Sequence, residues 1–287
     1  MPKRKRSPHQ SATVMDVAKQ ANVSAMTVSR VINGNPRVGE AMRERVLAAA
    51  KDLNYRPNLA GRLLRSSDIA RIGVLYSNPS AAYLNQLMIG LLEESSLSSS
   101  QVTVEMCAGI RGQHAAMRRL LKASVDGVVL LPPLCDSVQA IRHLKDNGVS
   151  VVAFASEPPV DDVTSVRIDD YKAARAMMRH LFKLGHRRIA LIKGEPTHTA
   201  ATLRAQAYFD AMHEAGAEVP EGYVVDGKFT YRSGLTAATR LLQLPNRPTA
   251  IFCSNDDMAA AATAVAHGLN LDIPNDITIT GFDDTPV

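Results

Sequence analysis

The amino-acid sequence predicts a small all-α domain at the amino terminus, followed by a larger α/β domain built from two lobes of parallel sheet. Residues 13–53 have helical periodicity, whereas residues 71–282 alternate short aliphatic runs with longer amphipathic patterns. Such alternation is typical of parallel sheets joined by right-handed helical crossovers. A polar stretch around Pro57, which interrupts any helix, separates the two parts. A length of 287 residues suits one small and one larger domain.

The amino-terminal part begins with two helix-start signals. Thr13 and Asp16 have the spacing of a capping box, in which each side chain accepts a hydrogen bond from the other residue's backbone amide. Ser24 is placed to cap a second helix that ends before Gly34. A third helix is expected over residues 40–53. Two short helices joined by a tight turn and followed by a third are typical of the helix-turn-helix, whose second helix enters the major groove of DNA.

The second helix carries residue types that can read base edges. Arg30 can donate two hydrogen bonds to guanine, a contact that contributes about 1–3 kcal/mol of discrimination. Ala25 and Met26 are apolar and can contact thymine methyl groups, and Thr27 and Ser29 are also expected on the outer face. Small helical trios also occur in proteins that do not bind DNA, so periodicity alone leaves that alternative open.

Basic residues are concentrated near the amino terminus. Residues 1–66 contain 13 Lys or Arg and 4 Asp or Glu, whereas the whole chain contains 33 and 28. The remainder therefore has a net charge of −4. This asymmetry favours contact between the first part and phosphates, although residues 3–6 alone are equally consistent with a solvated tail or a localisation signal.

The larger part consists of alternating strand and helix patterns. Candidate strands lie at residues 72–76, 102–106, 127–131, 149–154, 189–192, 250–253 and 277–282. Candidate helices lie at residues 83–95, 113–123, 137–147, 171–184, 202–215, 233–242 and 256–268. Seven strand–helix units fit two lobes of Rossmann-like topology better than one very wide sheet. The chain stops just after the last candidate strand, so we expect part of the core to be missing.

Polar residues follow several of the predicted strands. Ligands of parallel α/β sheets bind at the carboxyl ends of strands, so these side chains are expected to meet. Donors, acceptors and one aromatic ring at these ends suit a polyhydroxylated ligand such as a sugar. The candidate effector-binding residues are Asn78, His198, Arg204, Phe229, Asn255 and Asp283.

Most of these residues also have an ordinary structural explanation. Asn255 can cap the helix that begins at Asp256, and Arg204 can form a surface ion pair. His198 can be a loop histidine, and Asp283 can be a turn residue. The sequence leaves both explanations open.

Composition argues against a secreted or membrane-spanning protein. The basic amino terminus is not followed by an apolar stretch, and no run approaches about 18 apolar residues, so we expect a cytoplasmic protein. Cys107, Cys135 and Cys253 are widely spaced and are expected to be buried free thiols. No metal site and no cofactor are predicted.

Two other classes of protein are compatible with a two-lobed α/β domain. A solute-binding protein of transport would carry a leader peptide and would have no helical head. This sequence shows no leader pattern and does have a predicted helical head, and both observations argue against that class. An enzyme would need a catalytic motif, but the sequence lacks a dinucleotide fingerprint, a phosphate loop and a nucleophile elbow. His186 lies between basic neighbours, with no carboxylate to orient it as a catalytic base.

Several short motifs are specific in combination. In the helical head they are VMDVA at residues 14–18, VSAMTVSRVIN at 23–33 and LNYRPN at 53–58. Further along they are RIGV at 71–74, LGHRRIA at 184–190, SNDD at 254–257 and GFDD at 281–284. Together they closely resemble the lactose-repressor (LacI/GalR) family over essentially the whole chain. The resemblance implies a helix-turn-helix head on a periplasmic-binding-protein-like core.

The resemblance also implies how the head binds DNA. Three residues of the second helix match the family's base-reading positions, and residues 58–64 match a hinge helix that folds when two chains meet on an operator. Leu64 matches a leucine wedged into the minor groove, and its alternative is a core leucine of a short helix. The expected DNA-binding residues are Ala25, Met26, Thr27, Ser29, Arg30, Asn33, Asn58 and Leu64. In the sensor, Arg204, Asn255 and Asp283 match family effector contacts, and His198 and Phe229 match ligand-contacting positions in some members.

The sequence departs from the family pattern at several positions. Ala155 stands where many members have Asp, and Ala207 stands where Gly is common, which leaves the exact ligand open. Gly61 replaces Ala in the hinge helix, at a cost of about 0.8–1 kcal/mol in helix propensity, and Gly39 replaces a Ser-type cap. The family's last stretch, which returns to the first lobe, is absent.

We therefore expect a sequence-specific DNA-binding transcription regulator, a repressor of sugar uptake or catabolism genes at the bacterial nucleoid. The expected partners are double-stranded, pseudo-palindromic operator DNA, a sugar or sugar derivative as effector, and a second copy in a homodimer. The expected domains are a head with a basic arm (1–57), a hinge (58–67) and a sensor core (68–287), with lobes at about 68–165 and 166–287. The alternative is a cytosolic sugar-binding protein that does not read DNA specifically.

Overall fold

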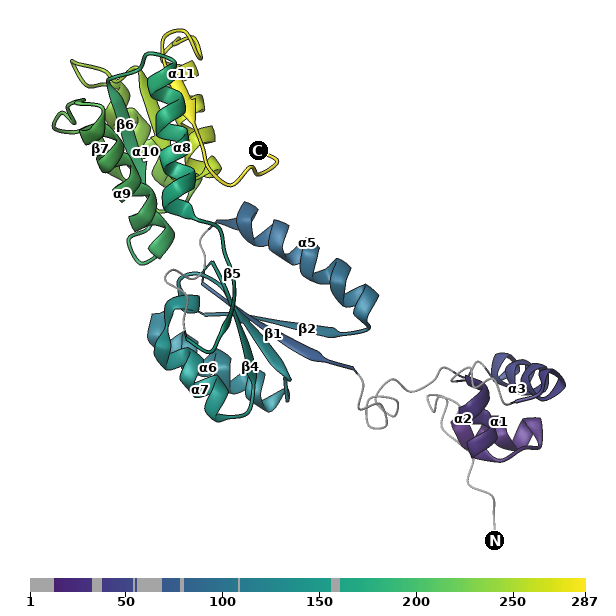
Figure 1. The fold of residues 1–287 in the computed structure, drawn as a ribbon. Helices are drawn as coiled ribbons and strands as arrows, with labels where there is room; N and C mark the ends of the chain where they lie inside the picture. Colours follow the sequence, from purple (N-terminus) through teal and green to yellow (C-terminus); the bar gives the residue numbers. More distant parts are fainter. Residues whose placement is uncertain are drawn as a thin grey trace. The chain divides into compact units, whose positions relative to one another are not determined.

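The computed structural model describes residues 13–32, 38–53, 55, 69–77, 80–107, 109–155 and 161–287. The chain divides into two compact units, Met1–Ile69 and Ala70–Val287. The described part of the first unit is helical, and the second contains two parallel sheets flanked by helices (Figure 1). The fold class predicted from the sequence is confirmed.

The described part of the first unit consists of three short helices. These are α1 (Val14–Ala21), α2 (Ala25–Ile32) and α3 (Glu40–Asp52). Their apolar faces meet in a small core, in which Val17, Val28 and Val46 are fully buried. Each helix therefore contributes a fully buried valine to the shared core. Helix α2 uses its inner face for this packing, and its outer face does not take part in the core.

The predicted helix starts are present in this unit. The Thr13 amide donates to the Asp16 carboxylate (2.9 Å), and the Asp16 amide donates back to the Thr13 hydroxyl (3.4 Å). The Thr27 amide donates to the Ser24 hydroxyl (3.1 Å). Asn22 adopts the left-handed conformation at the end of α1 (φ 51°), which Asn tolerates better than most residues. This local chemistry gives the tight turn between α1 and α2.

The first lobe of the second unit is a five-stranded parallel sheet with the order β2-β1-β3-β4-β5. Its strands are β1 (Arg71–Tyr76), β2 (Gln101–Met106), β3 (Gly127–Leu130), β4 (Ser150–Phe154) and β5 (Thr164–Val166). Its helices are α5 (Ala81–Ser98), α6 (Gly109–Lys122), the 3-10 helix η1 (Leu134–Asp136) and α7 (Val138–Asp146). Helices α6 and α7 pack on the sheet through a core in which Leu75, Leu120 and Leu144 are fully buried.

The second lobe is a four-stranded parallel sheet with the order β7-β6-β8-β9. Its strands are β6 (Ile189–Lys193), β7 (Val224–Asp226), β8 (Ala250–Cys253) and β9 (Thr278–Thr280). Its helices are α8 (Asp170–Lys183), α9 (Thr199–Glu214), α10 (Tyr231–Leu242) and α11 (Asp256–Gly268). Helices α8 and α9 pack in one core, and α10 and α11 in another (Figure 1). Strands β6 and β8 are therefore buried on both faces, which explains their continuous aliphatic sequences.

The helices and strands predicted from the sequence are present within the described residues, with ends shifted by a few residues. The structure adds β5, β7 and η1, each only three residues long. Both added strands lie at sheet edges, and segments of this length are too short to show a hydrophobic period. Among the described residues, no helix combines the length and apolar character needed to cross a membrane.

The core of the first lobe predicts a contrast between two leucines. Leu144→Ala on α7 removes a fully buried side chain, whereas Leu97→Ala on α5 removes one that is 82% exposed. The first change should lower the free energy of unfolding by about 2–5 kcal/mol, and the second by less than about 0.5 kcal/mol. Urea titration of the two variants measures both values. Equal effects would show that the α6–α7 face does not form the main core of this lobe.

Candidate functional site

A cavity of about 440 Å³ lies between the two lobes of the second unit. Segments that follow the carboxyl ends of parallel strands in both lobes border it, as expected for a fold of this class. The first lobe contributes, among others, Ser80, Tyr83, Leu87, Pro132, Phe154 and Ala155. The second contributes His198, Arg204, Phe229, Asn255, Phe282 and Asp283. The structure thus brings five of the six predicted effector-binding residues to one cavity, and Asn78 lies outside the described residues.

Arg204 contacts several groups at the cavity wall. Its Nε donates to Asp170 Oδ1 (2.8 Å), its Nη2 lies 2.7 Å from the same oxygen, and its Nη1 donates to the Ser254 carbonyl. The guanidinium carbon lies 3.5 Å from the centre of the Phe282 ring. The side chain is only 8% exposed, so Arg204 belongs to a buried ion pair and not to a surface pair. Asp170, its main partner, was not predicted as a site residue.

Asp283 is held less firmly by the same arginine. Its Oδ1 lies 3.6 Å from Arg204 Nη2, and its side chain is 16% exposed. Burial raises the pKa of Asp283 from its ordinary 3.8 to about 6; Arg204 opposes this shift, and nearby carboxylates, Asp256 foremost, add to it. Asp283 is therefore an incompletely neutralised acceptor at the cavity wall, which is a suitable partner for a ligand hydroxyl or N–H group.

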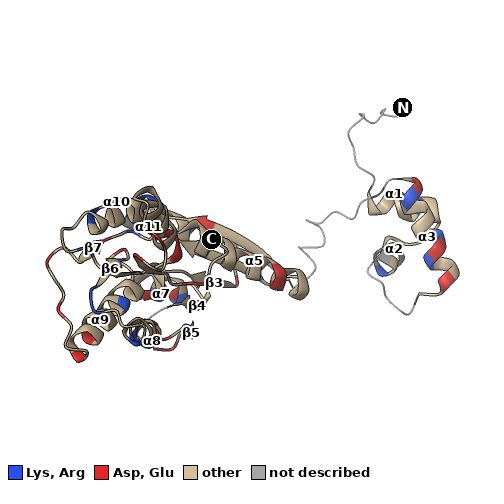
Figure 2. Ribbon diagram, turned by 90° about the horizontal axis from the view of Figure 1, so that it is seen from above, with Lys and Arg blue, Asp and Glu red and all other residues tan. Residues whose placement is uncertain are grey.

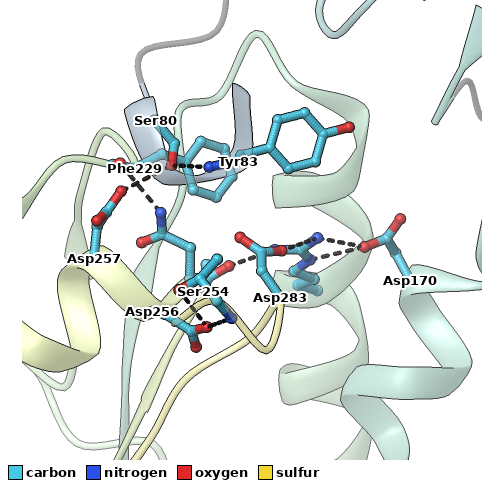
Figure 3. A network of polar contacts seen from close by, with 11 residues as sticks. Ser80, Tyr83, Asp170, Phe229, Ser254, Asp256, Asp257 and Asp283 are labelled. Atoms are coloured by element: carbon cyan, nitrogen blue, oxygen red, sulfur yellow. Dashed lines mark hydrogen bonds and ion pairs between the residues drawn. The ribbon is translucent and has the colours of Figure 1, made fainter. Parts of the chain in front are cut away.

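The loop that carries Asp283 is fixed from behind. Asp256 Oδ2 accepts hydrogen bonds from the Thr285 amide (2.7 Å) and the Thr285 hydroxyl (2.9 Å). A Cβ at Gly281 would lie 2.2 Å from Asp256 Oδ1, so the clamp requires glycine there. Asp283 itself has a φ of 105°, in the region that side chains rarely adopt. The clamp thus holds a strained turn that points Asp283 toward the cavity (Figure 3).

Asn255 has two structural roles in addition to lining the cavity. Its Oδ1 accepts from the Met258 amide (3.1 Å) and caps α11, and its Nδ2 donates to the Phe229 carbonyl (3.1 Å). The capping explanation is therefore correct. The second bond supports Phe229, whose φ is 56° and whose ring packs so closely on Gly194 that a Cβ there would lie 2.1 Å from the ring.

His198 is buried against the Phe229 ring. It is 3% exposed, it occupies the position before α9, and the two ring centroids are 5.3 Å apart. Burial lowers the pKa of His198 to about 4, with a smaller opposing contribution from Asp136. The imidazole is therefore neutral at pH 7 and can both donate and accept a hydrogen bond.

Tyr83 was not predicted from the sequence. Among the described residues, its hydroxyl is one of two buried side-chain groups without a hydrogen-bond partner. Its ring meets Phe154 edge-on at 6.4 Å. Burial raises its pKa above the ordinary range, and the Asp283 carboxylate adds to that shift. A signal was available, because Tyr83 lies in the first turn of the helix that follows the first strand, where ligands of parallel α/β sheets bind.

Two sensor residues that depart from the family pattern, Ala155 and Ala207, lie in different environments. Ala155 lines the cavity at the end of β4 with a φ of 62°. The described first-lobe lining therefore has no carboxylate at this position; it consists mainly of aromatic and aliphatic groups, with Ser80, Gln86 and Arg167 as polar members. Ala207 is fully buried in the core between α8 and α9 and does not line the cavity.

Other residues considered in the sequence are not part of the cavity lining. His186 Nδ1 is 3.0 Å from the Thr249 hydroxyl, in the connection before β6, so it has a structural partner. Cys107, Cys135 and Cys253 are buried free thiols, as predicted. Within the described part of the chain, no group of His, Cys, Asp and Glu is arranged to hold a metal ion.

In the first unit, α2 presents its predicted outer face to solvent. Met26 is 65% exposed, Arg30 is exposed, and Ala25 and Thr27 are partly exposed. The ribbon in Figure 2 has Lys or Arg positions on α1, α2 and α3, and Asp or Glu positions on α1 and α3. The side chain of Ser29, and Asn33, Asn58 and Leu64 altogether, lie outside the described residues.

A helical reading head joined to a two-lobed α/β domain with an interlobe cavity defines a class of DNA-binding regulators controlled by small molecules. Residues 13–58 match the family described as bacterial regulatory proteins of the lacI family. Residues 70–284 match the periplasmic binding proteins and sugar-binding domain of the LacI family. The chain therefore belongs to the LacI family, whose members are transcription regulators and not enzymes.

Named relatives agree with this assignment. The chain is 33% identical to catabolite control protein A of Priestia megaterium over 96% of its own length and 83% of that protein. It is also 33% identical to the repressor PurR of Escherichia coli O139:H28, over 95% and 80%. The operator-bound lac repressor dimer with the anti-inducer ONPF superimposes with a TM-score of 0.82 at 28% identity, over 96% and 84%. The CelR–cellobiose complex superimposes with a TM-score of 0.67 at 32% identity, over 96% and 83%.

The shifted pKa of Asp283 predicts a pH dependence of stability. Because its folded-state pKa of about 6 exceeds the ordinary 3.8, its stabilising contribution is fully present below pH 3.8 and is lost as pH rises through 6. Between pH 4 and 7.5, the parent should lose about 2 kcal/mol of unfolding free energy relative to Asp283→Asn. Urea titrations across this range measure the difference. The exposed Asp226→Asn is the matched control, and parallel curves for parent and Asp283→Asn would contradict the prediction.

Proposed function

We propose that this chain is a repressor that binds a pseudo-palindromic operator as a homodimer and changes its operator affinity when a sugar-type effector fills the interlobe cavity. The proposal rests on the residues that line this cavity, in a chain that also has a helix-turn-helix head. Its second-lobe wall offers Arg204, Asp283 and neutral His198, whereas its first-lobe wall offers the rings of Tyr83 and Phe154.

A hydroxyl-rich ring fits this pair of walls. Asp283 accepts and His198 can donate or accept, so the second lobe can bond several hydroxyl groups. Aromatic rings can cover the C–H face of a sugar ring, and the unpartnered Tyr83 hydroxyl can bond one more ligand atom. The relative CelR, which was solved with cellobiose, adds support for a sugar. The alternative, a sugar-binding protein without specific DNA reading, leaves the exposed face of α2 without a role.

Coupling between the two sites requires unequal binding. An effector changes operator affinity only when it binds the DNA-competent and the incompetent arrangement differently, and the effect is reciprocal. We propose a head at residues 1–57, a hinge at 58–67 and a sensor at 68–287, acting at the nucleoid in the bacterial cytoplasm. Asn33, Asn58 and Leu64 remain proposed DNA contacts within this scheme.

The DNA-reading role is tested with duplexes of random sequence. The parent should select a palindromic consensus. Arg30→Ala should relax one base pair in each half-site, at a cost of about 1–3 kcal/mol for the preferred base. Arg45→Ala, which removes an exposed arginine from α3, is the matched control and should keep the consensus. A uniform loss across all sequences with Arg30→Ala would remove this residue from base reading.

The effector-sensing role is tested by repeating the selection with a panel of mono- and disaccharides. One sugar should change the enrichment, and Asp283→Ala should abolish that change while operator binding persists. Asp226→Ala, which removes an exposed carboxylate of the same lobe, should respond as the parent does. If no sugar changes the enrichment of the consensus, the proposal that the effector is a sugar would be refuted. The search would then turn to planar ring compounds, which the same aromatic wall would accept.

A further inference from the structure

Hydrogen bonds between described residues join the lobes beside the cavity at two places. The Ser80 hydroxyl donates to Asp257 Oδ2 (2.8 Å), and the Thr199 hydroxyl donates to Asp136 Oδ2 (2.7 Å). We propose that these bonds, here called the interlobe latches, set the balance between the closed and open sensor and thereby tune effector affinity. The proposal rests on the proposed effector-controlled function and adds to it four residues outside the predicted effector set.

The first latch explains an unusual pattern of burial. Helix α5 contains no fully buried residue, yet Ser80, the residue that caps it, is only 4% exposed. Its hydroxyl accepts from the Tyr83 amide (3.3 Å) and donates to Asp257 in the first turn of α11 (Figure 3). Ser80 therefore fixes the start of α5 and touches the second lobe with the same oxygen. The Ser80 hydroxyl oxygen thus links the contact between the lobes to the placement of Tyr83.

The second latch places a carboxylate at a helix start. Asp136 ends η1 in the first lobe, and Thr199 is the first residue of α9 in the second. Negative charge at the amino end of a helix is favourable because the unpaired amides carry partial positive charge. His198, adjacent to Thr199, lines the cavity. Each latch thus borders the cavity, and the two latches join different pairs of elements.

The latches can shift the equilibrium between the closed and open sensor without locking the sensor closed. In the open arrangement their hydroxyls and carboxylates would bond to water, so each latch stabilises the closed sensor only by the difference in free energy between its protein bond and its bonds to water. A net hydrogen bond of this kind favours the closed sensor by about 3- to 10-fold. An effector that needs the closed sensor then binds more tightly by a similar factor.

The test measures lobe separation in the full chain without any effector. Lys122→Cys and Glu218→Cys place spin labels on exposed positions, one in each lobe. The three native cysteines are buried and should not react. Labelled chains are diluted with an excess of unlabelled chain so that only the distance within one chain is measured, and pulsed electron spin resonance should then give one narrow distance for the labelled parent. Thr199→Val and Asp257→Ala should each broaden it, and the double variant should shift most of the population to a second distance.

Controls separate a lost latch from a damaged fold. Thr263→Val removes a hydroxyl that bonds only within α11 (3.0 Å) and should keep the narrow distance. Thr199→Ser retains a donor and should restore it. A broad distribution in the parent, or an unchanged one in the double variant, would overturn the proposal. Operator selection on the same variants tests the proposed function separately, because the latches are not required for a palindromic consensus.

Discussion

The sensor depends above all on the burial of one positive charge. A buried guanidinium is costly unless its donors are paired, and removal of one partner leaves an uncompensated charge. Arg204 of α9 meets this requirement with Asp170 at the start of α8, the Ser254 carbonyl after β8 and the ring of Phe282 after β9. Four segments far apart in the sequence are thereby held at one edge of the second sheet. The wall of the cavity follows from this single constraint.

The same constraint makes Asp283 available to a ligand. Arg204 directs two of its nitrogens to Asp170, so Asp283 receives only a longer contact of 3.6 Å. Its raised pKa is the electrostatic consequence, because burial and neighbouring carboxylates outweigh a distant cation. A ligand that donates a hydrogen bond to Asp283 would supply the stabilisation that the protein does not. In the proposed site, ligand recognition by Asp283 and its incomplete pairing with Arg204 would thus have the same origin.

The sequence predicted the parts of this arrangement that local chemistry determines. Long periodic segments, the Thr13–Asp16 capping box and the polar ends of β6, β8 and β9 were all identifiable, because each signal lies within a few residues. Asp170 and Tyr83 were missed for the opposite reason. Asp170 looks like an ordinary acidic residue of a first helical turn, and only the fold brings α9 and its arginine within 3 Å of it. The unpartnered state of the Tyr83 hydroxyl likewise depends on its neighbours in three dimensions.

In the proposed effector site the two lobes would contribute unequally to recognition, and this asymmetry bears on how a ligand signal would be produced. The polar second-lobe wall is held by Arg204 and the Asp256–Thr285 clamp, so it is preorganised before any ligand arrives. The described first-lobe wall includes the rings of Tyr83 and Phe154, and the first lobe meets the second through Ser80 and Asp136. A ligand would therefore bond first to the second lobe and gain its remaining contacts only on closure. Selectivity would reside mainly in the second-lobe polar groups, whereas the strength of the response would depend on how readily the first lobe closes.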